Sequence, residues 1–297
     1  MQNPFLTLLL AATLVSAASL PPTPQPSSPK EPTPRPLRQE HLKITVPPAV
    51  RQGEVLQVQV RNAETPPLTA TLANREAHFF QQRDGSYLAL VSVSVFESPK
   101  MAMLNIQDAQ GELLDSESIM IQDAHYRIQN VQVSKATEGL KPLPGELEAI
   151  QTLKDMVSPA RYWSEPFLSP TPDCQNSPFG VLRYHNGKPT GDYHKGVDLR
   201  SPMGRPIRAI TGGRVQIARM FRLHGGTVGL DHGQGVSSIY IHMSKVAVKA
   251  GQLVSQGETI GYVGSTGFAT GPHLHWGLYV SGLPVNPSQF IHVPKCQ

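Results

Sequence analysis

Five residues in the C-terminal half of the chain have side chains that could bind a metal ion or move protons. His273 and His275 stand two positions apart in "TGPHLHW", His194 precedes Asp198 by four residues in "YHKGVDL", and His242 lies in the apolar run "SSIYIHMS". Imidazole nitrogens and carboxylate oxygens are the usual ligands of catalytic zinc, which takes three protein ligands and keeps one position open. His194, Asp198 and one histidine of the HxH pair would supply this set, leaving two histidines for proton transfer.

These residues must be positioned mainly by strands. Residues two apart in a strand point to one side, so both rings of the HxH pair are expected to enter the same space. The HxxxD spacing fits one helical turn, but Gly196 and Val197 disfavour a helix there and favour a strand beside a turn. Each motif alone is also compatible with half-buried histidines that bind no metal. Their occurrence together in one domain favours a shared site.

The rest of the chain divides by composition. Residues 1–18 have the apolar run and small-residue end of a secretory signal, and the run is shorter than the ~20 residues of a membrane span. Residues 19–40 are rich in proline and read as an extended linker. The chain is therefore expected to be exported to the periplasm, the extracellular space or the cell wall, with no stable membrane insertion once the signal is removed.

Two β domains are expected after this linker. Residues 41–130 alternate apolar and polar residues between turn signals, as in an immunoglobulin-like β-sandwich. Residues 131–165 form a connector with a short helix. Residues 166–294 are glycine-rich and predict an antiparallel β domain. The fold class is therefore all-β. One apolar face of the connector helix is expected from Leu147, Ile150, Leu153 and Met156.

Composition narrows the partners. The formal net charge is +4, and the chain has no block of consecutive lysine and arginine residues. Nucleic acid is therefore not expected as a partner. Two cysteines in an exported chain predict one disulfide, Cys174–Cys296, with two free thiols as the alternative. Six further histidines lack a spaced partner. His78 and His125 are interpreted as surface or partly buried residues, and His185, His224, His232 and His292 as turn or surface residues.

The motifs together resemble the LytM/lysostaphin-type zinc metallopeptidases, secreted enzymes that cut peptidoglycan peptides. The resemblance covers about 130 residues, from 167 to 292, and depends on HxxxD, the Y-x-H strand, "VKAGQLVSQGETIGYVGSTG" and "TGPHLH" in combination. It implies a barrel-sandwich-like peptidase domain with one Zn²⁺, peptidoglycan as the partner, His194, Asp198 and His275 as metal ligands, and His242 and His273 as catalytic residues. Which peptide bond is cut, and the oligomeric state, do not follow from it.

The implied mechanism is hydrolysis by a zinc-activated water. His273 would accept the proton of the water, and His242 would stabilise the oxyanion or position the water. Tyr240, two residues before His242, is a candidate for holding substrate. Many relatives carry glutamate two positions after the last histidine, whereas this chain has Gly277.

Two other classes of protein compete with a peptidase. One is an inactive regulator or activator of other wall hydrolases on the same fold, which the complete ligand set argues against. The other is a carrier domain, because "VAVKAGQLVSQGETIG" resembles the hairpin of biotinyl and lipoyl domains. No lysine stands at the hairpin tip in the expected setting, so this likeness indicates shared architecture.

Overall fold

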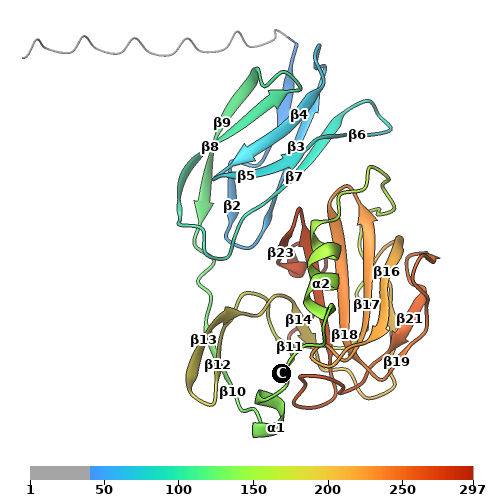
Figure 1. The fold of residues 1–297 in the computed structure, drawn as a ribbon. Helices are drawn as coiled ribbons and strands as arrows, with labels where there is room; N and C mark the ends of the chain where they lie inside the picture. The colour runs from blue at the N-terminus through green and yellow to red at the C-terminus, as the bar shows by residue number, and fades with distance from the viewer. Residues whose placement is uncertain (1–40, 297) are drawn as a thin grey trace, which may run out of the picture. The chain divides into compact units, whose positions relative to one another are not determined.

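The computed structural model describes residues 41–296, and these are almost entirely β (Figure 1). The predicted all-β fold class is therefore confirmed. The predicted signal peptide (1–18) and proline-rich linker (19–40) lie outside the described residues. Within 41–296, no helix has both the length and the apolar character needed to cross a membrane.

The first part is a sandwich of two sheets. One sheet has the order β1-β3-β7-β6 and the other β2-β9-β8-β4-β5. The strands are β1 (Lys43–Thr45), β2 (Ala49–Arg51), β3 (Val55–Arg61), β4 (Pro67–Leu72), β5 (Arg75–His78), β6 (Phe80–Gln81), β7 (Tyr87–Ser92), β8 (Lys100–Asp108) and β9 (Leu113–Gln122). Their alternating apolar residues, such as Val58, Leu104 and Ile119, form one buried cluster. An immunoglobulin-like relationship of this sandwich stays a prediction.

The connector begins with a strand. β10 (Ile128–Val131) pairs in parallel with β12 (Leu182–His185), which pairs with β13 (Lys188–Tyr193). The expected domain boundary after residue 130 therefore cuts a strand that belongs to a sheet of the second part. α1 (Lys135–Glu138) and α2 (Glu146–Asp155) follow β10.

Helix α2 lies against β16 and β17 (Figure 1). Its buried residues are Glu146, Ile150 and Leu153, while Leu147 is 51% exposed and Met156 lies past the helix end. The predicted apolar face was therefore wrong at both ends. The reason is that a carboxylate, Glu146, occupies the first buried position, where backbone N–H groups satisfy it.

The second part is built on an eight-stranded sheet of order β11-β14-β22-β18-β17-β16-β20, with β23 paired to β22. All its pairings are antiparallel, as predicted. The strands are β11 (Gln175–Ser177), β14 (Val197–Leu199), β16 (Gly213–Met220), β17 (Gly226–Gly233), β18 (Val236–Met243), β20 (Leu253–Val254), β22 (Leu274–Val280) and β23 (Leu283–Val285). A 3₁₀ helix, Pro287–Gln289, follows.

The two faces of this sheet differ. Leu274, Trp276 and Leu278 of β22 alternate onto one face and join the main core cluster. That cluster also includes residues of a smaller sheet, β15 (Pro206–Arg208), β21 (Thr259–Tyr262) and β19 (Lys245–Val246). Ile239 and Tyr279 project from the opposite face into a second cluster under α2. The helix therefore lies on the face of β22 to which His275, between Leu274 and Trp276, also points.

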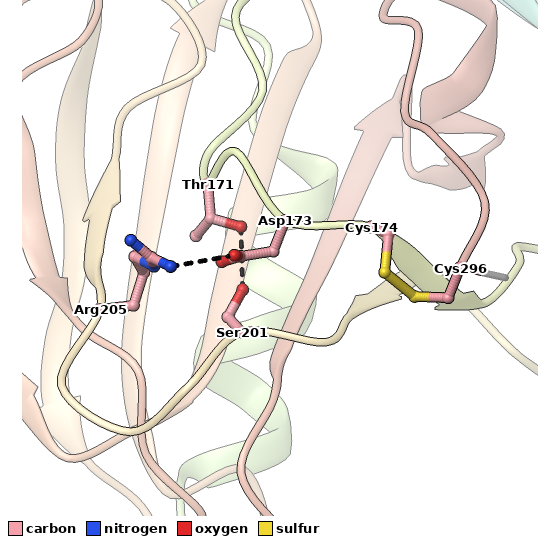
Figure 2. The surroundings of a disulfide bond; sticks show 6 residues. All are labelled: Thr171, Asp173, Cys174, Ser201, Arg205 and Cys296. Atoms are coloured by element: carbon pink, nitrogen blue, oxygen red, sulfur yellow. Dashed lines mark hydrogen bonds and ion pairs between the residues drawn. A yellow bond between two sulfur atoms is a disulfide. The ribbon is translucent and has the colours of Figure 1, made fainter.

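A disulfide ties the end of the chain to this sheet. Cys174 and Cys296 are bonded, as predicted (Figure 2). The N–H of Cys296 donates to the carbonyl of Gln175 at 3.0 Å. Gln175 begins β11, the edge strand that pairs with β14. The crosslink therefore supports the strand that carries Asp198.

Candidate metal centre

Three side chains converge at one edge of the sheet. Asp198 in β14 pairs directly with His275 in β22, and His194 follows the last residue of β13. Nε2 of His194, Oδ1 of Asp198 and Nδ1 of His275 lie 2.9 Å from one another in all three pairs. These are the three residues predicted as metal ligands, and they form a potential metal-binding group.

The protonation states of these three residues leave lone pairs that can bind a cation. Nδ1 of His194 lies 2.8 Å from the carbonyl of Pro178, which assigns the ring hydrogen to Nδ1 and leaves a lone pair on Nε2. Burial lowers the pKa of His275 to about 4, so its imidazole is neutral near pH 7. Burial would raise the pKa of Asp198, but His194 and His275 hold it well below its usual range. Two imidazole nitrogens and one carboxylate oxygen then converge, as the donor set of a catalytic Zn²⁺ requires.

Glycine at position 196 is a steric requirement of this centre. A Cβ there would lie 2.3 Å from the carbonyl oxygen of Trp276 and 2.8 Å from Nε2 of His275. The HxxxD segment therefore packs directly on the strand that carries His275. This close contact lets residues on separate strands share one ion.

The two histidines predicted to be catalytic lie beside the three ligand atoms. The ring centroids of His242 and His273 are 4.8 Å apart, and Nε2 of His273 lies 3.9 Å from Oδ1 of Asp198. Nδ1 of His242 lies 2.8 Å from the carbonyl of Thr266, and Nδ1 of His273 lies 2.9 Å from that of Gly271. Both rings therefore donate through Nδ1 and keep the Nε2 lone pair as an acceptor.

His242 reaches the site because it breaks the alternation of β18. Its φ of 64° is in the left-handed region, which costs a non-glycine residue roughly 1–2 kcal/mol. As a result, the consecutive residues Ile241 and His242 both line the groove at the site. Backbone strain of this kind persists only where the surroundings hold it, and here the N–H of His242 donates to the carbonyl of His224.

The prediction that Tyr240 contacts substrate is wrong. Tyr240 is fully buried on the core face of β18, and its hydroxyl interacts with Ser238 Oγ and the N–H of Ile210. The i, i+2 rule would place Tyr240 with His242, but the left-handed residue His242 is turned to the other face. Tyr240 therefore supports the sheet from beneath.

Arg183 also lies at the site, although no sequence motif pointed to it. Its guanidinium lies 3.2 Å from Oδ2 of Asp198 and also donates to Gln129 and Ser177. Oδ2 is therefore held by the arginine, while Oδ1 faces the two histidines. The arginine orients the carboxylate in the way that outer partners of metal ligands do.

Three of the histidines that were interpreted as turn or surface residues are buried or partly buried and contact other side chains. His232 is fully buried between Gly212 and Ser238. His185 stacks on Phe268 with ring centroids 5.5 Å apart, and His224 pairs with Glu146. Both His185 and His224 line the groove. The exposed positions of His78, His125 and His292 agree with the prediction.

The centre lies in a groove of about 640 Å³. Residues of α2 form one wall, residues around β12 and β13 another, and β18 and β22 contribute the floor. Gly277 is buried beneath this floor, beside Ile239, the carbonyl of Lys195 and the hydroxyl of Tyr279. A Cβ there would lie 3.1 Å from Ile239 and 3.3 Å from each of the two oxygens, so a larger residue at this position requires its neighbours to shift.

A single-metal His–Asp–His set with two further histidines in an open groove defines a metallohydrolase-type site. Residues 192–287 match the model of peptidase family M23. The C-terminal part of the chain therefore belongs to peptidase family M23, a metallopeptidase family.

Two named bacterial proteins are similar in sequence to this C-terminal segment. The DD-carboxypeptidase/endopeptidase Mpg of Neisseria meningitidis is 41% identical over 112 residues, which are 38% of this chain and 26% of Mpg. The peptidoglycan DD-endopeptidase ShyA of Vibrio cholerae is 44% identical over 93 residues, 31% of this chain and 22% of ShyA. The matched segment thus spans about a quarter of the length of these curated relatives.

A solved structure extends the likeness beyond the matched segment. A Pseudomonas aeruginosa protein assigned to peptidase M23 has 27% sequence identity and a TM-score of 0.63, and the match covers 82% of this chain and 94% of that one. The shared fold therefore includes more of the chain than the peptidase domain alone.

Proposed function

We propose that this protein is an exported zinc-dependent endopeptidase that hydrolyses peptide cross-links or bridges of bacterial peptidoglycan. The observation that carries the proposal is the convergence of His194, Asp198 and His275 with the acceptor nitrogens of two further histidines. Support for the substrate comes from the relatives named as peptidoglycan DD-endopeptidases.

In this proposal His194, Asp198 and His275 hold one Zn²⁺, which supplies Lewis acidity toward a peptide carbonyl and activates water. Arg183 neutralises and orients the outer oxygen of Asp198. Gly196 keeps the HxxxD segment against β22. The ligand geometry is therefore set by strand pairing and by one fixed carboxylate.

His273 is the proton acceptor in the proposed reaction. Its Nδ1–H is fixed by the carbonyl of Gly271, so Nε2 faces the centre as a base and can return the proton to the leaving amine. Burial, together with the nearby His273 and His275, lowers the pKa of His242 to about 3. A group with so low a pKa is a poor base near pH 7.

His242 then positions the attacking water. With its hydrogen on Nδ1, its Nε2 accepts a hydrogen bond and has none to donate. Of the two roles expected for His242, this tautomer favours holding the water over stabilising an oxyanion. The two histidines thus receive different roles from similar surroundings.

The proposal is tested on purified, zinc-loaded protein incubated with purified peptidoglycan sacculi. Mass spectrometry of the soluble fragments identifies the bond that is cut. Cleavage of cross-links by the intact chain, abolished by His273→Ala, would support the proposal. Zinc binding without any peptide cleavage would contradict it and favour an inactive regulator of other wall hydrolases.

A further inference from the structure

One end of the groove carries a lysine ammonium group that forms no direct ion pair. Three cationic side chains with fixed charge line the groove: Arg183, Lys195 and Lys154. Arg183 pairs with Asp198 at 3.2 Å, and Lys195 pairs with Asp192 at 2.7 Å. Within residues 41–296, Lys154 has no carboxylate at ion-pairing distance.

The two carboxylates that act on Lys154 from nearby, Asp155 and Asp192, are each bonded to another side chain. Its Nζ lies over the ring of Tyr279, 5.3 Å from the centroid. Burial and the charge of Lys195 lower the pKa of Lys154, while the carboxylates of Asp155 and Asp192, neither in an ion pair with it, act in the opposite direction. The carboxylate of Asp155, the next residue, accepts two hydrogen bonds from Gln151 at 2.8 Å. A half-buried ammonium group without a direct ion pair favours an anion from outside the chain.

Lys154 stands at a defined distance from the metal centre. Tyr279 lies four residues after His275 on the same face of β22, which corresponds to roughly 13 Å at the rise of a strand. Gly277, between them, is buried against Ile239, the carbonyl of Lys195 and the hydroxyl of Tyr279, so Ile239 and Tyr279 form the groove surface at this place. An extended peptide lying in the groove parallel to β22 would reach Lys154 within about four residues of the scissile bond.

We propose that Lys154 binds a carboxylate of the substrate peptide and thereby selects acidic over amidated wall peptides. This inference rests on the proposed function for its substrate class, since uncleaved and cleaved stem peptides carry free carboxylates. A charge-assisted hydrogen bond at a partly desolvated ammonium is about twice as strong as a neutral one, so the acidic form is preferred by about tenfold. Lys154 lies on α2, outside the segment 192–287 that matches the peptidase family.

The test compares two synthetic cross-linked peptide dimers, one with free carboxylates and one with the same carboxylates amidated. KM and kcat are measured for the zinc-loaded wild type, Lys154→Gln, Lys154→Arg and the control Lys141→Gln, which removes an exposed charge that does not line the groove. Lys154→Gln is expected to raise KM about tenfold for the acidic dimer only, with kcat and zinc content unchanged. Lys154→Arg is expected to retain the preference, and Lys141→Gln to match the wild type.

Equal KM values of wild type and Lys154→Gln for the acidic dimer would overturn the inference. So would an equal loss on both dimers with a lower melting temperature, because that result assigns Lys154 to packing on Tyr279. Calorimetric binding of the tetrapeptide L-Ala-D-Glu-meso-diaminopimelate-D-Ala, as acid and as C-terminal amide, needs no turnover. If neither dimer is cleaved but the acid binds tighter than the amide through Lys154, the proposed reaction fails and the carboxylate site stands.

Discussion

Oε1 of Glu146 lies 2.7 Å from Nδ1 of His224, although 78 positions separate the two residues in the sequence. The same fully buried carboxylate accepts hydrogen bonds from the N–H groups of Leu143, Arg222, Leu223 and His224. Successive backbone N–H groups form an anion-binding concavity, and here an internal anion fills it. The helix that precedes the peptidase segment therefore holds a loop of the groove.

This contact extends to the proposed water-positioning histidine. The carbonyl of His224 accepts from the N–H of His242, and the carbonyl of Leu223 accepts from the N–H of Phe268. Burial would raise the pKa of Glu146, but the hydrogen bonds from Leu143, His224 and Arg222 outweigh it and lower the pKa to about 2. Glu146 is thus ionised throughout the working pH range and acts as a positioning residue.

Glu146→Gln should reduce both stability and turnover. It removes the charge and places an amide N–H₂ among donors, which costs about 1–3 kcal/mol for each buried donor left unpaired. Hydrogen exchange should show faster exchange of the amides of residues 222–224 and of His242, with zinc content retained. Glu148→Gln, on the exposed side of α2, is the control. Unchanged exchange at His242 would disprove the connection from Glu146 to the site.

Substitution of the proposed metal ligand His194 and of the proposed base His273 should have different effects on zinc content and turnover. His194→Ala removes one of three donors and should yield protein with little zinc, whereas His273→Ala should bind a full equivalent. His273→Ala should lower kcat by about 10²–10⁴-fold, the usual contribution of a general base. Elemental analysis gives the metal content, and hydrolysis of a cross-linked peptide gives kcat. Intact turnover in His273→Ala would assign the base to another group.

Two glycines of the loop before β22 should respond differently to alanine. Gly267 has φ 75°, and a Cβ there would lie 2.5 Å from the N of Gly225 and the carbonyl oxygen of Leu223. Gly267→Ala therefore costs at least the roughly 1–2 kcal/mol of a left-handed alanine, plus displacement of the groove loop. A Cβ at Gly271 meets nothing within 4 Å. Melting temperatures should fall for Gly267→Ala and stay near wild type for Gly271→Ala; equal values would contradict the loop packing.

Much of the site could be predicted from residue type and spacing. The same-face rule for positions two apart placed His273 and His275 in one groove, and the HxxxD spacing was compatible with a strand beside a turn. The rule failed for Tyr240 because it assumes regular strand geometry, and His242 is left-handed. A left-handed histidine has no sequence signal, since its backbone is held by tertiary contacts.

The charged partners of the site could not be predicted for a different reason. Glu146 and Arg183 belong to elements far from the HxxxD and HxH motifs in sequence, and their importance depends on which atoms the fold brings to them. Burial of His232 was missed because a single histidine in a glycine-rich strand reads as a turn residue. Its two ring nitrogens are satisfied by Gly212 and Ser238, which only the strand pairing brings near.

The disulfide should matter for stability more than for chemistry. It closes a loop with a sequence separation of 122, and a bond across so long a loop stabilises a fold by about 3–5 kcal/mol. The double variant Cys174→Ser, Cys296→Ser should unfold at a lower denaturant concentration and retain zinc below its melting temperature. If its unfolding midpoint equals that of the wild type, the crosslink adds no stability to the edge strand β11.

Buried His232 should make the protein less stable in mild acid. Burial lowers the pKa of His232 from 6.5 to about 4, so the unfolded chain binds a proton that the folded chain does not bind between these values. The contribution of neutral, buried His232 to the free energy of unfolding is fully present above pH 6.5. It decreases as the pH drops toward 4 and changes no further at lower pH. The loss is about 3 kcal/mol, because one unit of pKa corresponds to about 1.4 kcal/mol.

The comparison of wild type with His232→Gln isolates this effect from the other histidines. Denaturant unfolding at pH 7 and pH 4 should show the stability difference between the two proteins narrowing by about 3 kcal/mol on acidification. His292→Gln, at an exposed position, should differ from wild type by the same amount at both pH values. A constant difference for His232→Gln as well would mean that His232 accepts a proton inside the fold, and that the interactions among His232, Ser238 and Tyr240 tolerate the charge.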